Sequence, residues 1–330
     1  MRRLLILLVL LASGCVRAPV GLPAHQQEGP WEHRFVEVPD RVDGAALRMH
    51  YLAAGPVDAP RVVLVHGFPD TAYGWRDVLP ALVEDHRVLA PDLRGYGGTD
   101  RPEAGYEAWS LEQDIAGFIR AANAADGVPA DSKVHLLTHD WGAAVGWWVA
   151  ARSPELLRSF TALSVPHPLA WARFLEEDAE QRKRATYQKQ LAGGGVHRLL
   201  GGLSKKQLAS LLWRANLVHP EAFSDDDLQI YADTFRTADD WEPPLRYYRA
   251  LQRTSEATLE QAKADPKVAA PTLVLWGESD DYLYPRQAPM SCEYVDADCE
   301  VEVFEEAGHW IQWDQPEALV ARWRAFTRSR

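Results

Sequence analysis

Asp140 stands in the motif His139-Asp140-Trp141-Gly142, directly after a run of apolar residues. Small residues behind the aspartate let a buried strand turn sharply into a helix that packs closely on a sheet. Such a turn exposes its central side chain, which in this chain is a carboxylate. A carboxylate held there can attack a carbon atom and form an ester with it. For the motif taken alone, an aspartate that merely caps the following helix is the alternative.

Three further segments place useful groups after predicted strands. His66-Gly67-Phe68-Pro69 follows an early strand, and its Phe68 N–H, together with the Trp141 N–H, could hold an oxyanion. Asp280 follows a late strand, and His309 follows the last one. The chain order matches a nucleophile, an acid that orients a histidine, and a histidine that acts as general base. The four segments together favour catalysis over capping.

The elements that must position these groups alternate along the chain. Apolar runs bounded by turn residues predict strands at 61–66, 87–91, 133–138, 271–276 and 299–304. Helical patterns lie between them, and the clearest predicts a helix that begins at Ser110, with Gln113 completing a capping box. This alternation predicts an α/β fold with a mostly parallel central sheet flanked by helices.

The alternation stops between about His167 and Arg249, where helical patterns occur without a convincing strand. We therefore expect a core formed by residues 34–166 and 250–330, with an all-helical cap, residues 167–249, inserted into it. No spacing typical of a metal site occurs in the sequence. We expect neither a metal nor another cofactor.

From about Trp31 onward the chain resembles the α/β-hydrolase superfamily, through the motifs at 66–69, 92–102 and 139–142. These motifs are similar to the branch that contains epoxide hydrolases and haloalkane dehalogenases. The resemblance implies that Asp140 forms an alkyl ester, which is then hydrolysed by water that His309, oriented by Asp280, activates. It implies Phe68 and Trp141 N–H groups in the oxyanion hole, within a loop formed by His66, Gly67 and Pro69.

The leaving group distinguishes the two activities of this branch. Dehalogenases typically hold the halide with the indole of the tryptophan after the nucleophile and with an asparagine in the oxyanion loop. Trp141 is present, but Phe68 offers no side-chain donor. The resemblance therefore favours an epoxide hydrolase that acts on a small neutral epoxide, with haloalkane dehalogenase as the alternative.

Epoxide hydrolases of this family protonate the opened ring with two cap tyrosines. Leu245-Arg246-Tyr247-Tyr248-Arg249 resembles the segment that carries one of them and implies Tyr248, while Tyr187 stands near the usual place of the other. Tyr247 and Tyr231 are the alternatives. A phenol, with an ordinary pKa near 10, is protonated at neutral pH yet acidic enough to help an alkoxide leave.

The N-terminus has a different character. Three residues with two arginines precede an apolar run at 4–12, whereas spanning a bilayer takes about 20 residues. Small residues and Cys15 follow, which is typical of an export signal and resembles a bacterial lipoprotein signal. The resemblance predicts a signal peptide (1–14), a lipidated Cys15, a tether (15–33) and anchoring in the cell envelope, on the periplasmic side of the outer membrane. An ordinary cleaved signal with an incidental cysteine is the alternative.

The composition excludes some classes of protein. Across 330 residues, 47% hydrophobic and 25% charged residues are typical of a globular chain. A net charge of −12 gives no electrostatic footprint for nucleic acid.

After export, Cys292 and Cys299 could form a disulfide, although two buried thiols fit the same spacing. A lipid-anchored binding module without catalysis stays a distant alternative, because no member of the catalytic set is missing. The oligomeric state is left open.

Overall fold

The computed structural model describes residues 29–39, 42, 44–328 and 330. The predicted signal peptide, the lipidated Cys15 and most of the predicted tether lie outside the described residues and stay predictions. In the described ranges, no helix is both long enough and apolar enough to cross a membrane.

The described residues form an eight-stranded sheet with the order β1-β2-β4-β3-β5-β6-β7-β8. β2 pairs antiparallel with β1 and β4, and every other neighbouring pair is parallel. This architecture confirms the predicted fold class. The strands are β1 Glu32–Pro39, β2 Ala46–Ala54, β3 Arg61–Val65, β4 Arg87–Pro91, β5 Val134–His139, β6 Leu157–Leu163, β7 Thr272–Gly277 and β8 Cys299–Phe304.

The five predicted strands are present as β3, β4, β5, β7 and β8, each within one residue of its predicted ends. The sequence patterns did not predict β1, β2 or β6. β1 begins at Glu32, inside the predicted tether. The missed β6 matters for the site, because it lies between β5 and β7 and its carboxyl end adjoins theirs.

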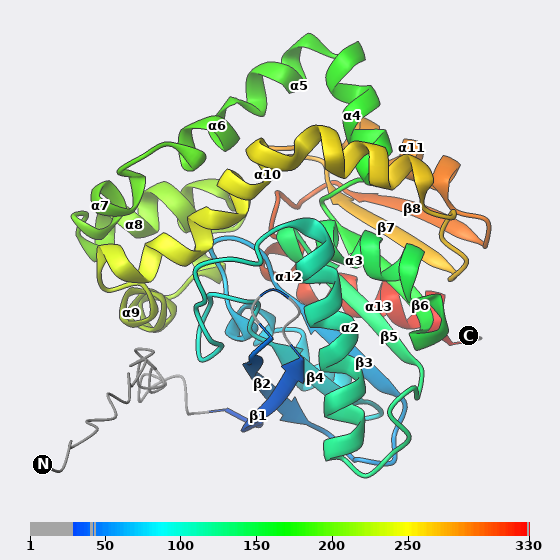
Figure 1. The fold of residues 1–330 in the computed structure, drawn as a ribbon. Helices are drawn as coiled ribbons and strands as arrows, with labels where there is room; N and C mark the ends of the chain where they lie inside the picture. Colours follow the sequence, from blue (N-terminus) through cyan, green and yellow to red (C-terminus); the bar gives the residue numbers. More distant parts are fainter. Residues whose placement is uncertain (1–28, 40–41, 43, 329) are drawn as a thin grey trace, which may run out of the picture.

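Helices cover both faces of the sheet (Figure 1). Val63 and Val65 of β3 share a core with α2 and α3, whereas Val62 and Leu64 share a second core with α1 and α13. This alternation follows from the two-residue period of a strand. The helices of the α/β part are η2 Ala72–Trp75, α1 Leu79–Leu82, α2 Ala108–Ala125, α3 Trp141–Arg152, η3 Pro154–Leu156, η7 Pro285–Gln287, α11 Ala288–Ser291, η8 Cys292–Tyr294, α12 Ile311–Asp314 and α13 Pro316–Thr327.

Helix α2 begins earlier than predicted. Its N-cap is Glu107 and its first residue is Ala108, so the predicted start at Ser110 is wrong. The N–H of Ser110 donates to the Glu107 carbonyl at 3.0 Å, which places Ser110 inside the first turn. A residue there cannot serve as the cap, because the cap must stand outside the helix.

Every element between β6 and β7 is helical, and these elements arch over one end of the sheet (Figure 1). We call residues 168–264 the helical segment. Its last helix is continuous to Ala264 and so runs past the cap boundary expected at 249. Its members are α4 Pro168–Glu177, α5 Ala179–Arg184, α6 Thr186–Ala192, α7 Val196–Gly201, α8 Lys205–Leu208, η4 Ala209–Trp213, η5 Arg214–Asn216, η6 Pro220–Ala222, α9 Asp225–Thr234 and α10 Ala238–Ala264.

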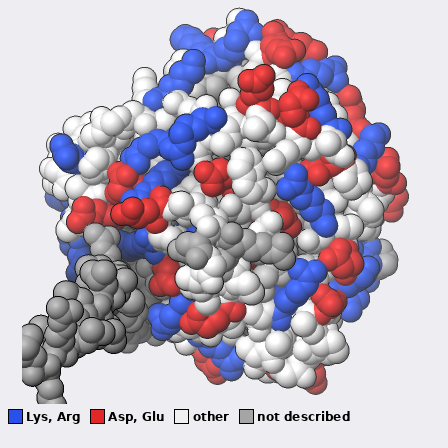
Figure 2. All heavy atoms as spheres, viewed as in Figure 1, with Lys and Arg blue, Asp and Glu red and all other residues white. Residues whose placement is uncertain are grey.

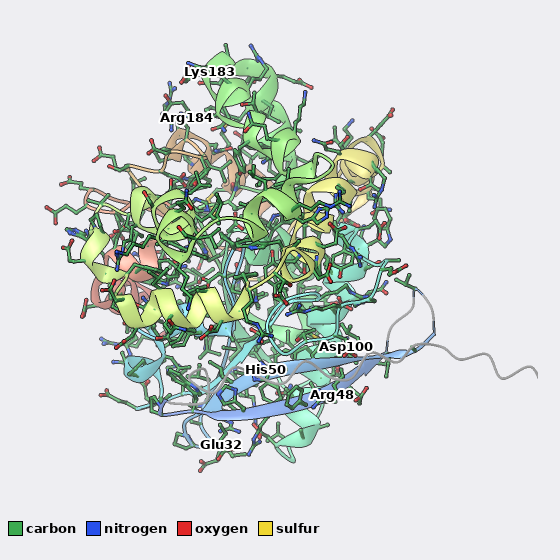
Figure 3. The ribbon with its side chains drawn as sticks, turned by 90° about the vertical axis from the view of Figure 1, so that its left-hand side faces the viewer. Glu32, Arg48, His50, Asp100, Lys183 and Arg184 are labelled. Atoms are coloured by element: carbon green, nitrogen blue, oxygen red, sulfur yellow. A yellow bond between two sulfur atoms is a disulfide. The ribbon has the colours of Figure 1, made fainter. Side chains whose placement is uncertain are left out.

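Buried hydrogen bonds tie the helical segment to loops at the carboxyl ends of the strands. The Trp213 indole N–H donates to the Pro69 carbonyl at 3.1 Å, and the Tyr247 hydroxyl donates to the Arg94 carbonyl at 2.8 Å. In a view turned by 90°, Arg48 and His50 of β2 lie at the opposite end of the molecule from Arg184 of α5 (Figure 3). The helical segment therefore covers only the end of the sheet where β3, β5 and β7 terminate.

Cys292 and Cys299 are joined by a disulfide, with their Cα atoms 5.6 Å apart. The bond links η8 to the first residue of β8. The sequence alone left a disulfide and two thiols open, because spacing says nothing about how the two Cβ atoms face one another.

Candidate active site

Asp140 lies at the turn from β5 into α3, in a backbone conformation with φ 50° and ψ −121°. A positive φ is uncommon for a residue with a side chain, and here it lifts the carboxylate above the end of the strand. The turn is possible because Gly142 lies directly against the backbone of β3, where a Cβ would clash with the Val65 carbonyl.

The loop after β3 approaches this carboxylate from the side. The Phe68 N–H donates to Oδ1 of Asp140 at 2.7 Å. Gly67 lies so near that a Cβ would collide with the Asp140 side chain. The His66 ring fixes the loop: its Nε2 accepts the Leu93 N–H at 3.0 Å, so its Nδ1 donates to the Gly67 carbonyl at 2.9 Å. The structure therefore places the Phe68 N–H beside the carboxylate, and its role in an oxyanion hole stays a prediction.

The Trp141 N–H is the other predicted oxyanion donor. Trp141 is the first residue of α3 and follows Asp140 directly. In the described part of the chain, its N–H makes no hydrogen bond to the Asp140 carboxylate. Its oxyanion role stays a prediction. The Trp141 ring instead packs edge-on against Tyr248, with 5.2 Å between the ring centroids.

His309 lies between two carboxylates. Its Nε2 is 3.3 Å from Oδ2 of Asp140, and its Nδ1 is 2.8 Å from Oδ2 of Asp280. The other oxygen of Asp280 accepts the backbone N–H groups of Tyr282 and Leu283, at 2.8 and 2.9 Å. Asp280 is thus fixed on one side and orients the imidazole with the other, so the structure brings the three predicted residues together.

The electrostatics of the site follow from this arrangement. Burial alone would lower the pKa of His309, but the flanking carboxylates of Asp280 and Asp140 outweigh it and raise the pKa to about 10. Burial alone would raise the pKa of Asp140, but the hydrogen bond with His309 outweighs it and holds the pKa below its ordinary value. In the free protein at neutral pH, an imidazolium therefore faces an ionised carboxylate.

The sequence reasoning missed the groups that hold the backbone of His309. Its carbonyl accepts the Ser164 hydroxyl at 3.0 Å and lies 2.9 Å from Nε2 of His139. Burial lowers the pKa of His139 to about 3, so its ring is neutral and carries its proton on Nε2. Nδ1 then accepts from Gln312 at 3.1 Å. Ser164 follows β6, which was not predicted, so no sequence signal placed it here.

Tyr187 of α6 and Tyr248 of α10 lie together above Asp140, with 6.3 Å between their ring centroids. Burial, followed by the nearby Asp140 charge, raises the pKa of each phenol, so both stay protonated. The alternative tyrosines point elsewhere: the Tyr247 hydroxyl donates to the Arg94 carbonyl, and that of Tyr231 donates to Asp70. Of the four candidate tyrosines, Tyr187 and Tyr248 are the two that line the pockets beside Asp140, and their role as proton donors stays a prediction.

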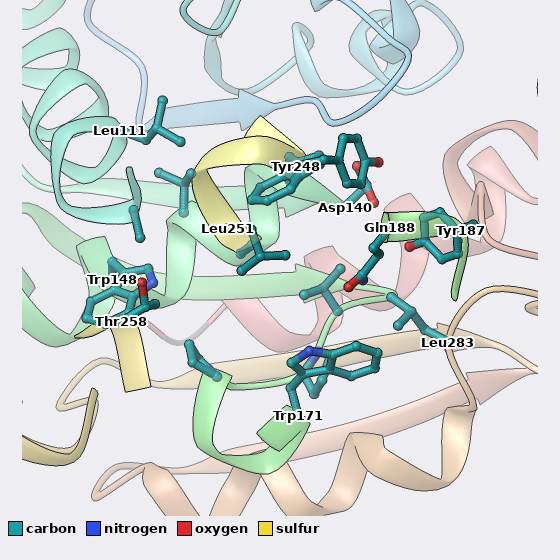
Figure 4. A pocket seen from close by; sticks show the side chains of 17 residues that line it. Leu111, Asp140, Trp148, Trp171, Tyr187, Gln188, Tyr248, Leu251, Thr258 and Leu283 are labelled. Atoms are coloured by element: carbon teal, nitrogen blue, oxygen red, sulfur yellow. The ribbon is translucent and has the colours of Figure 1, made fainter. Parts of the chain in front are cut away.

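Two pockets meet at this point, and Asp140, Tyr187 and Tyr248 line both. The first, which we call the α3 pocket, has a volume of about 130 Å³ and runs from Asp140 to Trp148 and Thr258 (Figure 4). The second, which we call the α7 pocket, has a volume of about 310 Å³ and extends past Tyr282 and His309 to α7. Both are largely apolar.

The described residues contain no group of three or more His, Cys, Asp or Glu side chains placed to hold a metal ion. A buried carboxylate can act as nucleophile, two phenols can donate protons, and a histidine paired with an acid can activate water.

Comparison with known proteins agrees with this geometry. A family model for the alpha/beta hydrolase fold matches residues 60–316. Epoxide hydrolase 2 of Caenorhabditis elegans is 32% identical over 88% of this chain and 78% of its own length. Epoxide hydrolase A of Mycobacterium tuberculosis is 30% identical over 85% of this chain and 94% of its own.

A solved structure is similar over the same range. The crystal structure of an epoxide hydrolase from Bacillus megaterium in complex with an inhibitor superposes with a TM-score of 0.75 at 26% identity, covering 89% of this chain and 100% of that one. The family model spans most of the chain, and the relatives are matched over most of their length. The chain therefore belongs to the alpha/beta hydrolase fold family.

Proposed function

We propose that this protein is an epoxide hydrolase, which opens an epoxide to a vicinal diol through an ester on Asp140. The observation that carries the proposal is the pair of protonated phenols, Tyr187 and Tyr248, lying over an ionised carboxylate in an apolar cavity. An epoxide needs a nucleophile on carbon and a proton donor on oxygen, and this site supplies both. The two relatives at 30–32% identity are named as epoxide hydrolases, which supports the same activity for this chain.

In the first step Asp140 attacks a ring carbon and the ring C–O bond breaks. Oδ1 is held by the Phe68 N–H at 2.7 Å, whereas Oδ2 has only the longer contact of 3.3 Å with His309, so we assign Oδ2 as the oxygen that forms the new bond. The ring oxygen takes a proton from Tyr187 or Tyr248, whose raised pKa values keep that proton available. The product is an alkyl ester whose carbonyl oxygen, Oδ1, already occupies the oxyanion site.

Formation of the ester changes the proton affinity of His309. Part of its raised pKa comes from the negative charge of Asp140, and esterification removes that charge. The pKa of His309 then falls, so its imidazolium can give up a proton, which restores the phenol that protonated the ring oxygen and leaves His309 as a neutral base. It takes a proton from water as the water oxygen attacks Cγ of Asp140, while the Phe68 N–H holds the oxyanion. Collapse of the tetrahedral intermediate expels the diol as an alkoxide, which receives a proton from His309. The proton left on the Asp140 carboxyl then passes to His309, which restores the free enzyme.

The haloalkane dehalogenase alternative uses the same nucleophile but releases a halide, which needs N–H donors and no proton. Phe68 stands at the position of the oxyanion loop where dehalogenases typically carry an asparagine. Its side chain has no hydrogen-bond donor and packs edge-on against Tyr248, with 5.2 Å between the ring centroids. Two phenols over the carboxylate have no evident task in that reaction.

An isotope experiment tests the proposal. An excess of enzyme is mixed with an epoxide in heavy-oxygen water, so that each enzyme molecule turns over once at most. We expect the released diol to be unlabelled, because the oxygen that it gains comes from Asp140. The heavy oxygen should appear in the Asp140 peptide by mass spectrometry. Label in the first diol would refute the ester. Release of halide from bromoalkanes, without turnover of any epoxide, would favour the dehalogenase.

The pH dependence gives a further prediction. As the pH falls through the pKa of His309 in the ester, its base form is lost and ester hydrolysis should slow by about tenfold per pH unit. Ring opening should persist, because the lowered pKa of Asp140 keeps this carboxylate ionised in mildly acidic solution. The fraction of esterified enzyme, measured by rapid quenching and mass spectrometry, should therefore rise as the pH is lowered. A constant fraction would contradict the assigned role of His309.

A further inference from the structure

The two pockets share only their meeting point. Of all the residues that line them, Asp140, Tyr187 and Tyr248 are common to both. The α3 pocket leaves this point between α3, α4 and α10, whereas the α7 pocket leaves it between the loop after β3 and α6, α7 and η4. The reacting groups therefore lie between two separate apolar spaces, and not at the bottom of one.

This placement bears on the shape of the substrate. The reacting ring must lie at the meeting point, within reach of Asp140 and the two phenols. An epoxide with one substituent would fill one pocket and leave the other unoccupied. We propose that the substrate is an internal epoxide that carries an apolar substituent on each ring carbon, one in each pocket. The inference rests on the proposed function and adds the substrate class.

The α3 pocket also indicates what kind of substituent it takes. Tyr248 and Thr258 of α10 both line it, and ten residues of helix at about 1.5 Å each span roughly 15 Å. Figure 4 shows Asp140, Tyr187 and Tyr248 toward one end of this pocket and Trp148 and Thr258 toward the other. A volume of about 130 Å³ along such a length is narrow, which fits an unbranched chain.

The α7 pocket has a larger volume, about 310 Å³, and exposed side chains line part of it. Two leucines that line it, Leu199 and Leu211, are 66% and 55% exposed. No residue exposed to this degree lines the α3 pocket. The substituent in the α7 pocket can therefore be bulkier, and substrate can enter from this side.

Charge limits the substituents further. Among the described residues, Asp140 is the one charged residue that lines the α3 pocket, and Asp140 and His309 are the only charged residues that line the α7 pocket. A carboxylate or ammonium group on either substituent would lose its hydration without finding a partner, which is costly. Both substituents are therefore uncharged where they lie inside the protein.

Blocking variants test the proposal. Thr258→Trp narrows the far end of the α3 pocket, and Val196→Trp narrows the α7 pocket; both side chains are half-buried. The substrates are a cis epoxide with a pentyl chain on each ring carbon, the same epoxide with a carboxylate at one chain end, and propylene oxide. The matched controls are Ala257→Trp on α10 and Arg198→Trp on α7, which are exposed and line neither pocket.

We expect the wild type to hydrolyse the dipentyl epoxide with a higher kcat/KM than its carboxylate analogue. Each blocking variant should lower kcat/KM for the dipentyl epoxide by about 10–200-fold, the usual effect of a mismatch in an apolar pocket. Propylene oxide needs little of either pocket, so its kcat/KM should fall by a smaller factor in each blocking variant than that of the dipentyl epoxide. Thermal unfolding of each variant, compared with the wild type, shows whether it is folded. The control variants should resemble the wild type.

Three results would overturn the inference. The wild type could turn over propylene oxide but not the dipentyl epoxide, either blocking variant could leave the dipentyl epoxide unaffected, or the carboxylate analogue could be the better substrate. In each case the proposed function stands. No turnover of any epoxide would remove the proposed function itself, and the inference with it.

Discussion

Replacing His309 with glutamine is expected to stop the enzyme at the ester. Glutamine keeps a polar side chain of similar reach but cannot accept a proton from water. Ring opening depends on Asp140 and the two tyrosines, so the first step should proceed and the second should slow by about 10²–10⁴-fold, the usual contribution of a general base. Intact-protein mass spectrometry should show one added substrate mass, located on Asp140 after digestion.

Two controls make this result specific. The double variant Asp140→Ala/His309→Gln should gain no mass, because the nucleophile is absent. His219→Gln should turn over substrate normally. The His219 side chain is partly exposed, and the hydrogen bond to Asp314, at 2.9 Å, comes from the backbone N–H, which the variant keeps. An adduct from bromoalkanes but from no epoxide would support the dehalogenase alternative. An adduct from neither would revive the idea of a binding module without catalysis.

The same residues show how far the sequence could predict this site. Asp140, Asp280 and His309 each follow a predicted strand, and the ends of parallel strands meet at one edge of a sheet. Local pattern and chain order were therefore enough to predict that these three residues come together. Phe68 could be found in the same way, from the loop after β3.

Other groups could not be found in this way, because their positions depend on tertiary packing. Ser159 and Thr161 of β6 are buried polar residues, and they interrupt the apolar run that would have indicated a strand. Without β6, neither Ser164 nor its hydrogen bond to the His309 carbonyl could be anticipated. The motif at Ser110 misled for a related reason: Ser110 and Gln113 have the spacing of a capping box, but the helix begins two residues earlier, at Ala108.

The helical segment shows the same limit more clearly. Helical periodicity predicts its helices but not which tyrosines turn toward Asp140. Tyr187, Tyr231, Tyr247 and Tyr248 were all candidates, and only the resemblance to a family favoured two of them. In the structure the hydroxyl of Tyr231 donates to Asp70 and that of Tyr247 donates to the Arg94 carbonyl, and neither residue lines a pocket with Asp140. The two remaining phenols line the pockets.

The different positions of these tyrosines lead to a second prediction with a large effect on the rate of ring opening. Tyr187→Phe and Tyr248→Phe should each slow ring opening, and the double variant should slow it by about 10²–10⁴-fold, because no acid then protonates the departing alkoxide. The losses should not simply add, since both phenols serve one oxygen atom. Rapid-quench measurement of ester formation in the His309→Gln background isolates this step from hydrolysis.

Tyr247→Phe is the matched control, because it removes the same hydroxyl one residue away. Its hydroxyl donates to the Arg94 carbonyl and lines neither pocket. This variant should lose about 1 kcal/mol of stability, typical of one buried hydrogen bond, with ring opening unchanged. Equal slowing in Tyr247→Phe and Tyr248→Phe would show that the tyrosines act through packing and not as acids.

A change of leaving group best distinguishes phenols that act as acids from phenols that only shape the cavity. A bromide departs as a stable anion and needs no proton, so any alkylation of Asp140 by a bromoalkane should be nearly insensitive to the two Tyr→Phe changes. Alkylation by an epoxide should depend strongly on them. If both reactions slowed equally, the phenols would serve to shape the cavity around Asp140, and the assignment of proton donors to Tyr187 and Tyr248 would fail.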